Sequence, residues 1–226
     1  MALYMNGQEI SQSSGVPISG ATKPYIEEIY NSDGQLISAN MHGYDAIRSY
    51  MFSDCPNLAL NSLPSGITSI GSNAFSGCTN LALTSLPSSI TSISSYTFYS
   101  CSNLALTSLP SGITSIGLGA FLNCSKLALT SLPSGLTSIG RDAFYHCPNL
   151  ALTSLPSGLT SIGNNAFEKC TGLTSITFTG TPTSIGNNAF SSCTNLTTIN
   201  VPWANGAVAN APWGATNATI NYGYTG

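Results

Sequence analysis

Apolar residues recur along this chain with a fixed period of 23 residues. Leu81 and Leu104 share one phase of the period, and Ile93 and Ile116 share another. Each period also holds a phenylalanine followed three positions later by a cysteine, at Phe52, Phe75, Phe98, Phe121, Phe144, Phe167 and Phe190, and at Cys55, Cys78, Cys101, Cys124, Cys147, Cys170 and Cys193. A fixed period of this length is typical of a solenoid, whose units bury their apolar faces only against neighbouring units.

Each 23-residue unit, called a coil below, predicts two short β segments. Residues 81–86 alternate apolar and polar side chains well enough for a strand, although the phase slips after Leu83. Pro87 ends that segment, and the Pro-Ser-Gly found in most coils is typical of a turn. The Ile/Leu-Thr-Ser-Ile that follows predicts the second β segment, which a glycine such as Gly117 closes.

The rest of each coil is the corner, x-x-Ala-Phe-x-x-Cys, as in residues 118–124. Its spacing predicts one short helical turn with phenylalanine and cysteine facing inward. The predicted fold class is therefore an α/β repeat solenoid of 23-residue coils, with short β-strands plus short helical turns. We predict an N-terminal cap or attachment segment at residues 1–43, a solenoid of about seven coils at 44–201 and a C-terminal cap at 202–226. Residues 219–222 alternate as a terminal strand would.

The cysteines, odd in number and always in the same phase, indicate a shared core position with free thiols. Disulfides between adjacent coils stay open as an alternative, because a sheet spacing of about 4.8 Å lies within the range that a disulfide accepts. No Cys-x-x-Cys or Cys/His cluster is present, so neither a metal nor another cofactor is expected.

The repeat as a whole resembles a known family. The pattern L-x-x-I-x-x-P-x-x-I-T-S-I-G-x-x-A-F-x-x-C, clearest from Leu173 to Cys193, is similar to the BspA-type leucine-rich repeats over about residues 44–201. Earlier coils depart from it at positions such as Thr84, where the family usually has isoleucine. The resemblance implies a right-handed, curved leucine-rich solenoid and a role in bacterial surface adhesion or host-protein binding.

The two ends of the chain bear on its location. The opening MALYMNGQEI and the ending APWGATNATINYGYTG resemble leucine-rich-repeat proteins found among phage and prophage tail genes of gut bacteria. The opening has no basic start followed by an apolar stretch, so no signal peptide is visible: it was removed, or the protein leaves the cell another way, such as lysis. We expect an extracellular, cell-surface or virion location and no membrane insertion.

Charge narrows the set of partners. Charged residues make up only 6% of the chain. Between Cys55 and Val201 the charged residues are Lys126, Arg141, Asp142, Glu168 and Lys169. Without a basic stripe to neutralise phosphates, nucleic-acid binding is not expected.

Catalytic motifs are missing from the sequence: it has no GxSxG, P-loop, GxGxxG or HExxH pattern. His146, beside Cys147 and four residues after Asp142, suggests a Cys-His nucleophile. The same cysteine phase recurs in six coils without histidine, so we interpret His146 as an exposed corner residue and predict that the protein is not an enzyme.

Variation within the array is concentrated at the residues that flank Ala-Phe in each corner. One interpretation is drift at solvent-exposed positions. The other is a stripe of ligand-binding side chains in consecutive coils, called the corner stripe below: Tyr96, Tyr99, Leu118, Leu122, Tyr145 and His146. A competing surface is the regular Ser/Thr lattice, such as Thr114-Ser115 and Thr137-Ser138, which suits a polysaccharide or ice, or simply solvates a sheet.

The predicted function is a non-enzymatic ligand-binding or adhesion solenoid that recognises a protein or glycan of a host or of a bacterial envelope. The alternative is a structural phage or prophage tail-associated receptor-binding module that residues 1–43 attach to the particle. Oligomerisation through residues 1–43 would favour this alternative.

Overall fold

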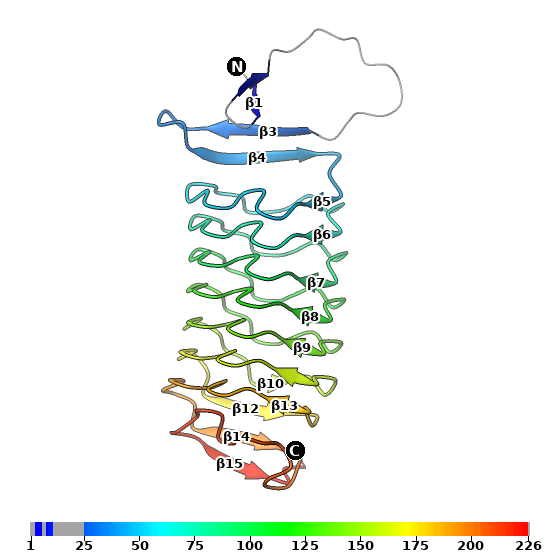
Figure 1. Cartoon of the computed structure of the whole chain (residues 1–226), viewed down its shortest axis with the longest axis vertical. Helices are drawn as coiled ribbons and strands as arrows, with labels where there is room; N and C mark the ends of the chain where they lie inside the picture. The colour runs from blue at the N-terminus through cyan, green and yellow to red at the C-terminus, as the bar shows by residue number, and fades with distance from the viewer. Residues whose placement is uncertain (1–2, 6–7, 11–24, 226) are drawn as a thin grey trace.

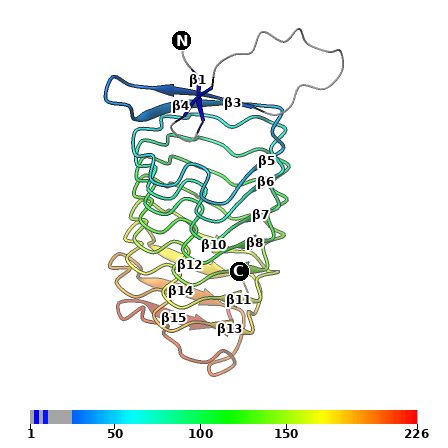
Figure 2. The same cartoon turned by 45° about the horizontal axis from the view of Figure 1, so that its top comes forward.

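The computed structural model, which describes residues 3–5, 8–10 and 25–225, is a stack of coils with a β-hairpin over its N-terminal end (Figure 1). Each coil lies directly on the next, so that residues one period apart in sequence become neighbours in space (Figure 2). The corners consequently line up along the stack.

The predicted second β segment is confirmed. It forms a five-stranded parallel sheet in the order β13-β11-β9-β8-β7, in which each serine pairs with the serine one coil away. The strands are β7 (Ser92–Ile93), β8 (Ser115–Ile116), β9 (Ser138–Ile139), β11 (Ser161–Ile162) and β13 (Ser184–Ile185). In the same register, β5 (Ala46–Ile47) pairs with β6 (Ser69–Ile70). Every isoleucine of this ladder is buried and every serine lies nearer the solvent.

The predicted first β segment becomes a strand only in the C-terminal coils. There β10 (Ser154–Leu155), β12 (Ser175–Phe178), β14 (Thr198–Val201) and β15 (Thr219–Tyr222) form a parallel sheet. Residues 81–86 hold no strand, although their three leucines are buried. Burial there follows the slipped phase, whereas burial in β12 and β14 alternates regularly. The terminal strand predicted at residues 219–222 is confirmed.

The predicted helical turn at the corner is wrong, since the described residues contain no helix. Successive N–H groups of the corner donate alternately to the next coil and to their own coil. Phe121 donates to Ala143 of the next coil (2.8 Å), whereas Leu122 donates to Gly119 of its own coil (3.1 Å). A helix would direct all of these N–H groups along its own axis and leave the coils unjoined at this edge. The fold class is accordingly a β-solenoid with hydrogen-bonded corner turns.

The core contains two ladders that run through the corners. The seven phenylalanine rings stack with centroids 5.3–5.7 Å apart. The cysteines are free thiols, buried except for the half-buried Cys55. From Cys78 onward, each thiol donates to the phenylalanine carbonyl of the preceding coil at 2.9–3.1 Å, as Cys124 does to Phe98. Cysteine thus fills a small apolar site and also supplies a donor to a buried carbonyl.

Non-repeating segments cover the two ends of the core. At the N-terminal end, β3 (Tyr25–Tyr30) and β4 (Leu36–His42) pair antiparallel, and the buried Ala39 and Met41 belong to the core. At the C-terminal end Trp203 and Trp213 are buried, and the indole of Trp213 donates to Ala209 (2.7 Å). A small antiparallel pair, β1 (Leu3–Met5) and β2 (Gln8–Ile10), precedes the hairpin.

The attachment role predicted for residues 1–43 falls in part on residues 1–2, 6–7 and 11–24, which lie outside the described ones. Within the described part of the chain, no helix is long and apolar enough to cross a membrane.

Candidate ligand-binding site

The alignment of the corners places the residues of the corner stripe in consecutive coils. The Tyr96 N–H donates to the Leu118 carbonyl (2.8 Å), and the Asn123 N–H donates to the Tyr145 carbonyl (2.9 Å). These backbone bonds set the tyrosines of one coil beside the leucines of the next. The six side chains, remote in sequence, therefore share one edge of the solenoid.

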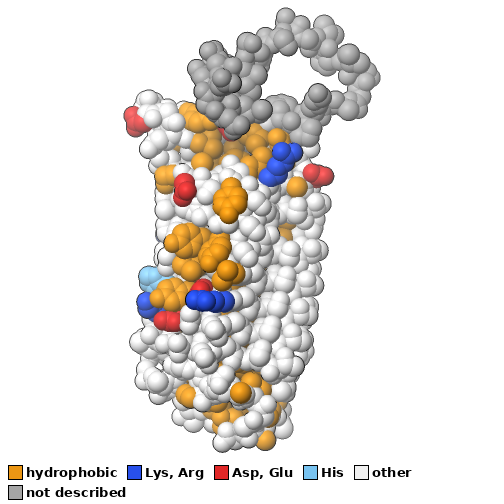
Figure 3. Space-filling view, in the orientation of Figure 1, with side chains coloured by type: hydrophobic (Ala, Val, Ile, Leu, Met, Phe, Trp, Pro, Cys, Tyr) orange, Lys and Arg blue, Asp and Glu red, His pale blue; other side chains and the backbone are white. Residues whose placement is uncertain are grey.

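The aromatic part of the stripe is accessible to a ligand. Tyr99 is 36% exposed, and its ring lies 6.0 Å from that of Tyr96 at an interplanar angle of 83°. Tyr96, Leu118 and Leu122 are half-buried. Figure 3 shows hydrophobic side chains gathered in a patch on this face, while most of the surrounding surface is uncharged. Apolar side chains grouped on an otherwise polar surface are a common feature of interaction sites.

Charged side chains follow the patch towards the C-terminal coils (Figure 3). Lys169 donates to the Tyr145 hydroxyl (2.6 Å) and lies 4.9 Å from the centre of that ring. The hydrogen bond to Tyr145 raises the pKa of Lys169, which stays protonated at neutral pH. Arg141 donates to Asp142 (3.1 Å), which forms an ion pair at this end of the stripe.

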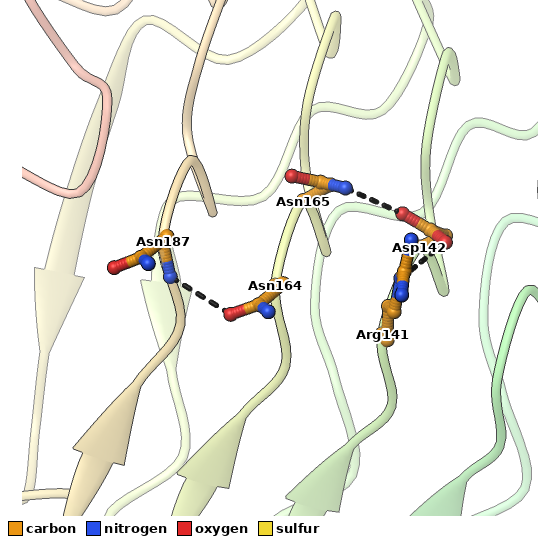
Figure 4. Close-up of polar contacts among 5 residues, drawn as sticks. All are labelled: Arg141, Asp142, Asn164, Asn165 and Asn187. Carbon is orange, nitrogen blue, oxygen red and sulfur yellow. Dashed lines mark hydrogen bonds and ion pairs between the residues drawn. The ribbon is translucent and has the colours of Figure 1, made fainter.

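Further polar contacts in these corners join one coil to the next (Figure 4). Asn165 donates from its amide to the Asp142 carboxylate (2.9 Å), and the Asn187 N–H donates to the side-chain oxygen of Asn164 (2.9 Å). Both carboxylate oxygens of Asp142 are therefore engaged, one by Asn165 and one by Arg141. Asp142 serves to connect corners in this arrangement.

The geometry separates the residues of the Cys-His pair considered from sequence. His146 is exposed, with its Nδ1 3.2 Å from the Asn123 side-chain oxygen. The Cys147 thiol points into the core and donates to the Phe121 carbonyl (3.1 Å). Burial raises the pKa of Cys147 to about 12, so this thiol stays protonated and is a poor nucleophile at neutral pH. Among the described residues, no group of three or more His, Cys, Asp or Glu side chains could hold a metal ion.

The threonine hydroxyls of the Ser/Thr lattice lie on the surface and bond to the backbone of the adjacent coil. Thr137 donates to the Thr114 carbonyl (3.0 Å), and Thr160 donates to the Thr137 carbonyl (2.9 Å). Thr114 and Thr183 repeat the contact in their own coils. Each of these threonines therefore uses its hydroxyl proton in a bond between adjacent coils.

Backbone conformation at the corners is a feature that the sequence interpretation missed. Two positions in each corner have positive φ: the residue directly before the cysteine, and the residue five positions before the cysteine. Asparagine, aspartate or glycine holds the second of these in five coils, as at Asn73, Gly119 and Asp142, whereas Tyr50 and Tyr96 hold it in the other two. Asparagine, aspartate and glycine tolerate the left-handed region best, so their recurrence was the available signal for a turn in place of a helix.

Stacked parallel coils with a leucine, isoleucine and phenylalanine core define a leucine-rich-repeat solenoid. The BspA type Leucine rich repeat region matches in six copies over residues 45–172 and 137–210. The chain therefore belongs to the BspA-type leucine-rich repeat family, as its repeat pattern predicted.

Two bacterial structures are similar to this chain. A leucine rich cell surface protein from Faecalibacterium prausnitzii A2-165 superposes with a TM-score of 0.64 at 28% identity, over 81% of this chain and 56% of that protein. The leucine-rich repeat protein of T. pallidum, TpLRR, gives a TM-score of 0.60 at 26% identity, over 76% of this chain and 87% of that one. The chain thus spans little more than half the length of the Faecalibacterium protein. No curated protein matches the chain.

Proposed function

We propose that this chain is a non-enzymatic binding protein that acts outside the cell, at a bacterial surface, and adheres through its corner stripe. The ligand class is a protein or glycan of a host or of a bacterial envelope. The observation that carries the proposal is the corner stripe itself, where aromatic and apolar side chains gather on a surface that otherwise carries mostly polar side chains; Tyr99 and His146 are exposed and the other members are half-buried. The cell-surface description of the Faecalibacterium protein supports the location.

The solenoid suits adhesion because its surface is preorganised. Backbone bonds between coils fix the stripe residues relative to one another before any ligand arrives, as between Tyr96 and Leu118. Binding then orders few new groups, which lowers its entropic cost. Tyrosine adds a large contact area together with a hydroxyl, a combination enriched in binding hot spots.

The chemistry of the described residues favours binding over catalysis. The Cys147 thiol is buried and protonated, and the Asp142 carboxylate is occupied by two neighbours. The threonine donors of the Ser/Thr lattice already bond within the array, which supports the corner stripe over that lattice as the contact surface.

Binding of the purified protein to host extracellular-matrix and mucin preparations, and in parallel to bacterial envelopes, tests the proposal. A variant with Tyr96, Tyr99 and Tyr145 replaced by serine should keep its fold and lose most of its binding. Tyr224→Ser is the matched control, because Tyr224 is 42% exposed and lies outside the stripe. Equal binding by the triple variant and the wild type would refute the proposal. Binding to host matrix supports an adhesin, whereas binding to envelopes alone supports the phage-type receptor module.

A further inference from the structure

β15 is the last strand of the stack, and one of its edges is open. In the sheet β10-β12-β14-β15 it pairs with β14 on one side, and no strand of the described residues pairs with it on the other (Figure 1). The Thr219 N–H donates to the Thr197 carbonyl of the preceding coil (2.9 Å). Because backbone groups point to opposite sides at alternate residues of a strand, Ile220 and Tyr222 direct their N–H and C=O groups away from β14. These groups form a row with which another strand can pair.

The N-terminal end of the solenoid is protected against such pairing. The β3–β4 hairpin covers this end, carries Glu27 and Glu28 in β3, and has an irregular register between Ile29 and Tyr30. Charged side chains and bulges are among the features that block the edge strands of natural sheets. β15 has none of these features, since its residues are uncharged, include no proline and keep a regular register with β14. No side chain after Lys169 is charged, so nothing at this end repels an approaching copy.

A ladder of polar side chains ends at the same edge. Asn200 donates to the Thr177 hydroxyl (3.2 Å), and Asn221 donates to the side-chain oxygen of Asn200 (2.8 Å). Asn221 is exposed and is the last member of this ladder. Its own side-chain oxygen accepts no hydrogen bond from the described residues. A further strand with an amide opposite Asn221 would extend the ladder.

We infer that β15 of a second copy of this chain pairs antiparallel with β15, about a twofold axis at Asn221. In this register Ile220 of each copy lies opposite Tyr222 of the other, and each of these pairs exchanges both of its N–H···O bonds. A β-branched residue opposite an aromatic one stabilises paired strands, and the twofold axis repeats this pair in both copies. The two Asn221 side chains face each other, where each amide can donate to the oxygen of the other.

A second copy suits this edge better than a flexible segment of another protein. Its β15 is already ordered by pairing with β14, so the association orders few additional residues. The edge also carries no charge that would attract or select a charged peptide. The dimer joins two four-stranded sheets into one continuous sheet and holds two corner stripes. The pairing itself does not depend on what the corner stripe binds.

Sedimentation equilibrium of the purified chain between about 1 μM and about 1 mM tests the inference. The average mass should rise from the monomer value of 23.3 kDa to twice that value and no further. Asn221→Lys places two ammonium groups opposite each other and removes the end of the ladder, so it should raise the Kd of the dimer about tenfold or more. Asn80→Lys is the matched control and should dimerise like the wild type. Asn80 is also exposed and also bonded to another asparagine, Asn103 (3.3 Å), but it lies in an N-terminal coil.

Amide hydrogen exchange measured by NMR locates the contact without any substitution. In the wild type, exchange at Ile220 and Tyr222 should slow as the protein concentration rises, because their N–H groups gain a partner in the dimer. The Thr219 N–H is already bonded to Thr197 and should change less. A monomer at the highest concentration, association beyond a dimer, equal effects of the two lysine variants, or concentration-independent exchange at Ile220 and Tyr222 would each overturn the inference.

Discussion

Truncation of one ring in the phenylalanine ladder tests how the solenoid is stabilised. Phe121 is fully buried and stacks on Phe98 at 5.5 Å and on Phe144 at 5.4 Å. Phe121→Ala removes buried apolar area and leaves a cavity in the core. Backbone hydrogen bonds between coils hold the coils on either side in place. Because the coils cannot collapse freely into that cavity, we expect a loss of about 3–5 kcal/mol in the free energy of unfolding.

The end of the ladder supplies the comparison. Phe52 is equally buried but stacks on a single ring of the ladder, Phe75, at 5.4 Å. Since an aromatic pair contributes about 0.5–1.5 kcal/mol beyond its buried area, Phe52→Ala should cost less than Phe121→Ala by about that amount.

Equilibrium unfolding in urea measures both losses. Circular dichroism follows the whole array, while tryptophan fluorescence follows the C-terminal end, because Trp203 and Trp213 both lie there. Coincident transitions from the two probes justify a two-state fit. A loss below about 1 kcal/mol for Phe121→Ala, or equal losses for the two variants, would refute the role assigned to stacking between coils.

Three other predictions concern packing and thiols. Gly163→Ala should lower the free energy of unfolding by about 1–3 kcal/mol, because the added Cβ would lie 2.7 Å from the Arg141 Cα. Gly135→Ala is the control, because a Cβ there has nothing within 4 Å, and it should change the free energy of unfolding in urea by less than about 0.5 kcal/mol. Burial raises the pKa of Cys147 from 9.0 to about 12, so between these values only the unfolded chain ionises there. The free energy of unfolding should therefore fall as pH rises through this interval, and it should fall less in Cys147→Ala. Urea titrations at about pH 8 and about pH 10 measure this fall, and an equal fall in the wild type and in Cys147→Ala would contradict the prediction. Thiol titration in denaturant without reductant should find seven free thiols, with Cys55 reacting first in the native protein, and markedly fewer would reveal disulfides.

Much of the architecture could be predicted from sequence because a solenoid repeats its core positions. Ile93 and Ile116 share a phase, and the structure pairs them in one parallel ladder. The same reasoning failed for residues 81–86, where the leucines are buried without forming a strand. Apolar periodicity predicts which side chains face inward. It does not predict whether the backbone forms hydrogen bonds with the next coil.

The corner shows the same limit more clearly. A spacing of three residues between Phe121 and Cys124 fits a helical turn. It also fits a turn in which every second N–H group donates a hydrogen bond to the next coil. The residue types with positive φ, such as Asn73 and Asp142, distinguish the two structures once all coils are compared. The close approach of the Tyr96 ring to Gly119 could not be predicted from the sequence, because the prediction requires knowing that the ring of one coil covers the backbone of the next.

Footprinting of tyrosine side chains, with and without the matrix or envelope preparation that binds, tests the central claim most directly. Oxidative labelling read by mass spectrometry reports each tyrosine separately. If the corner stripe is the contact surface, Tyr96, Tyr99 and Tyr145 should be protected on binding while Tyr224 keeps its reactivity. Unchanged labelling of the three stripe tyrosines in the bound protein would show that another face of the solenoid makes the contact.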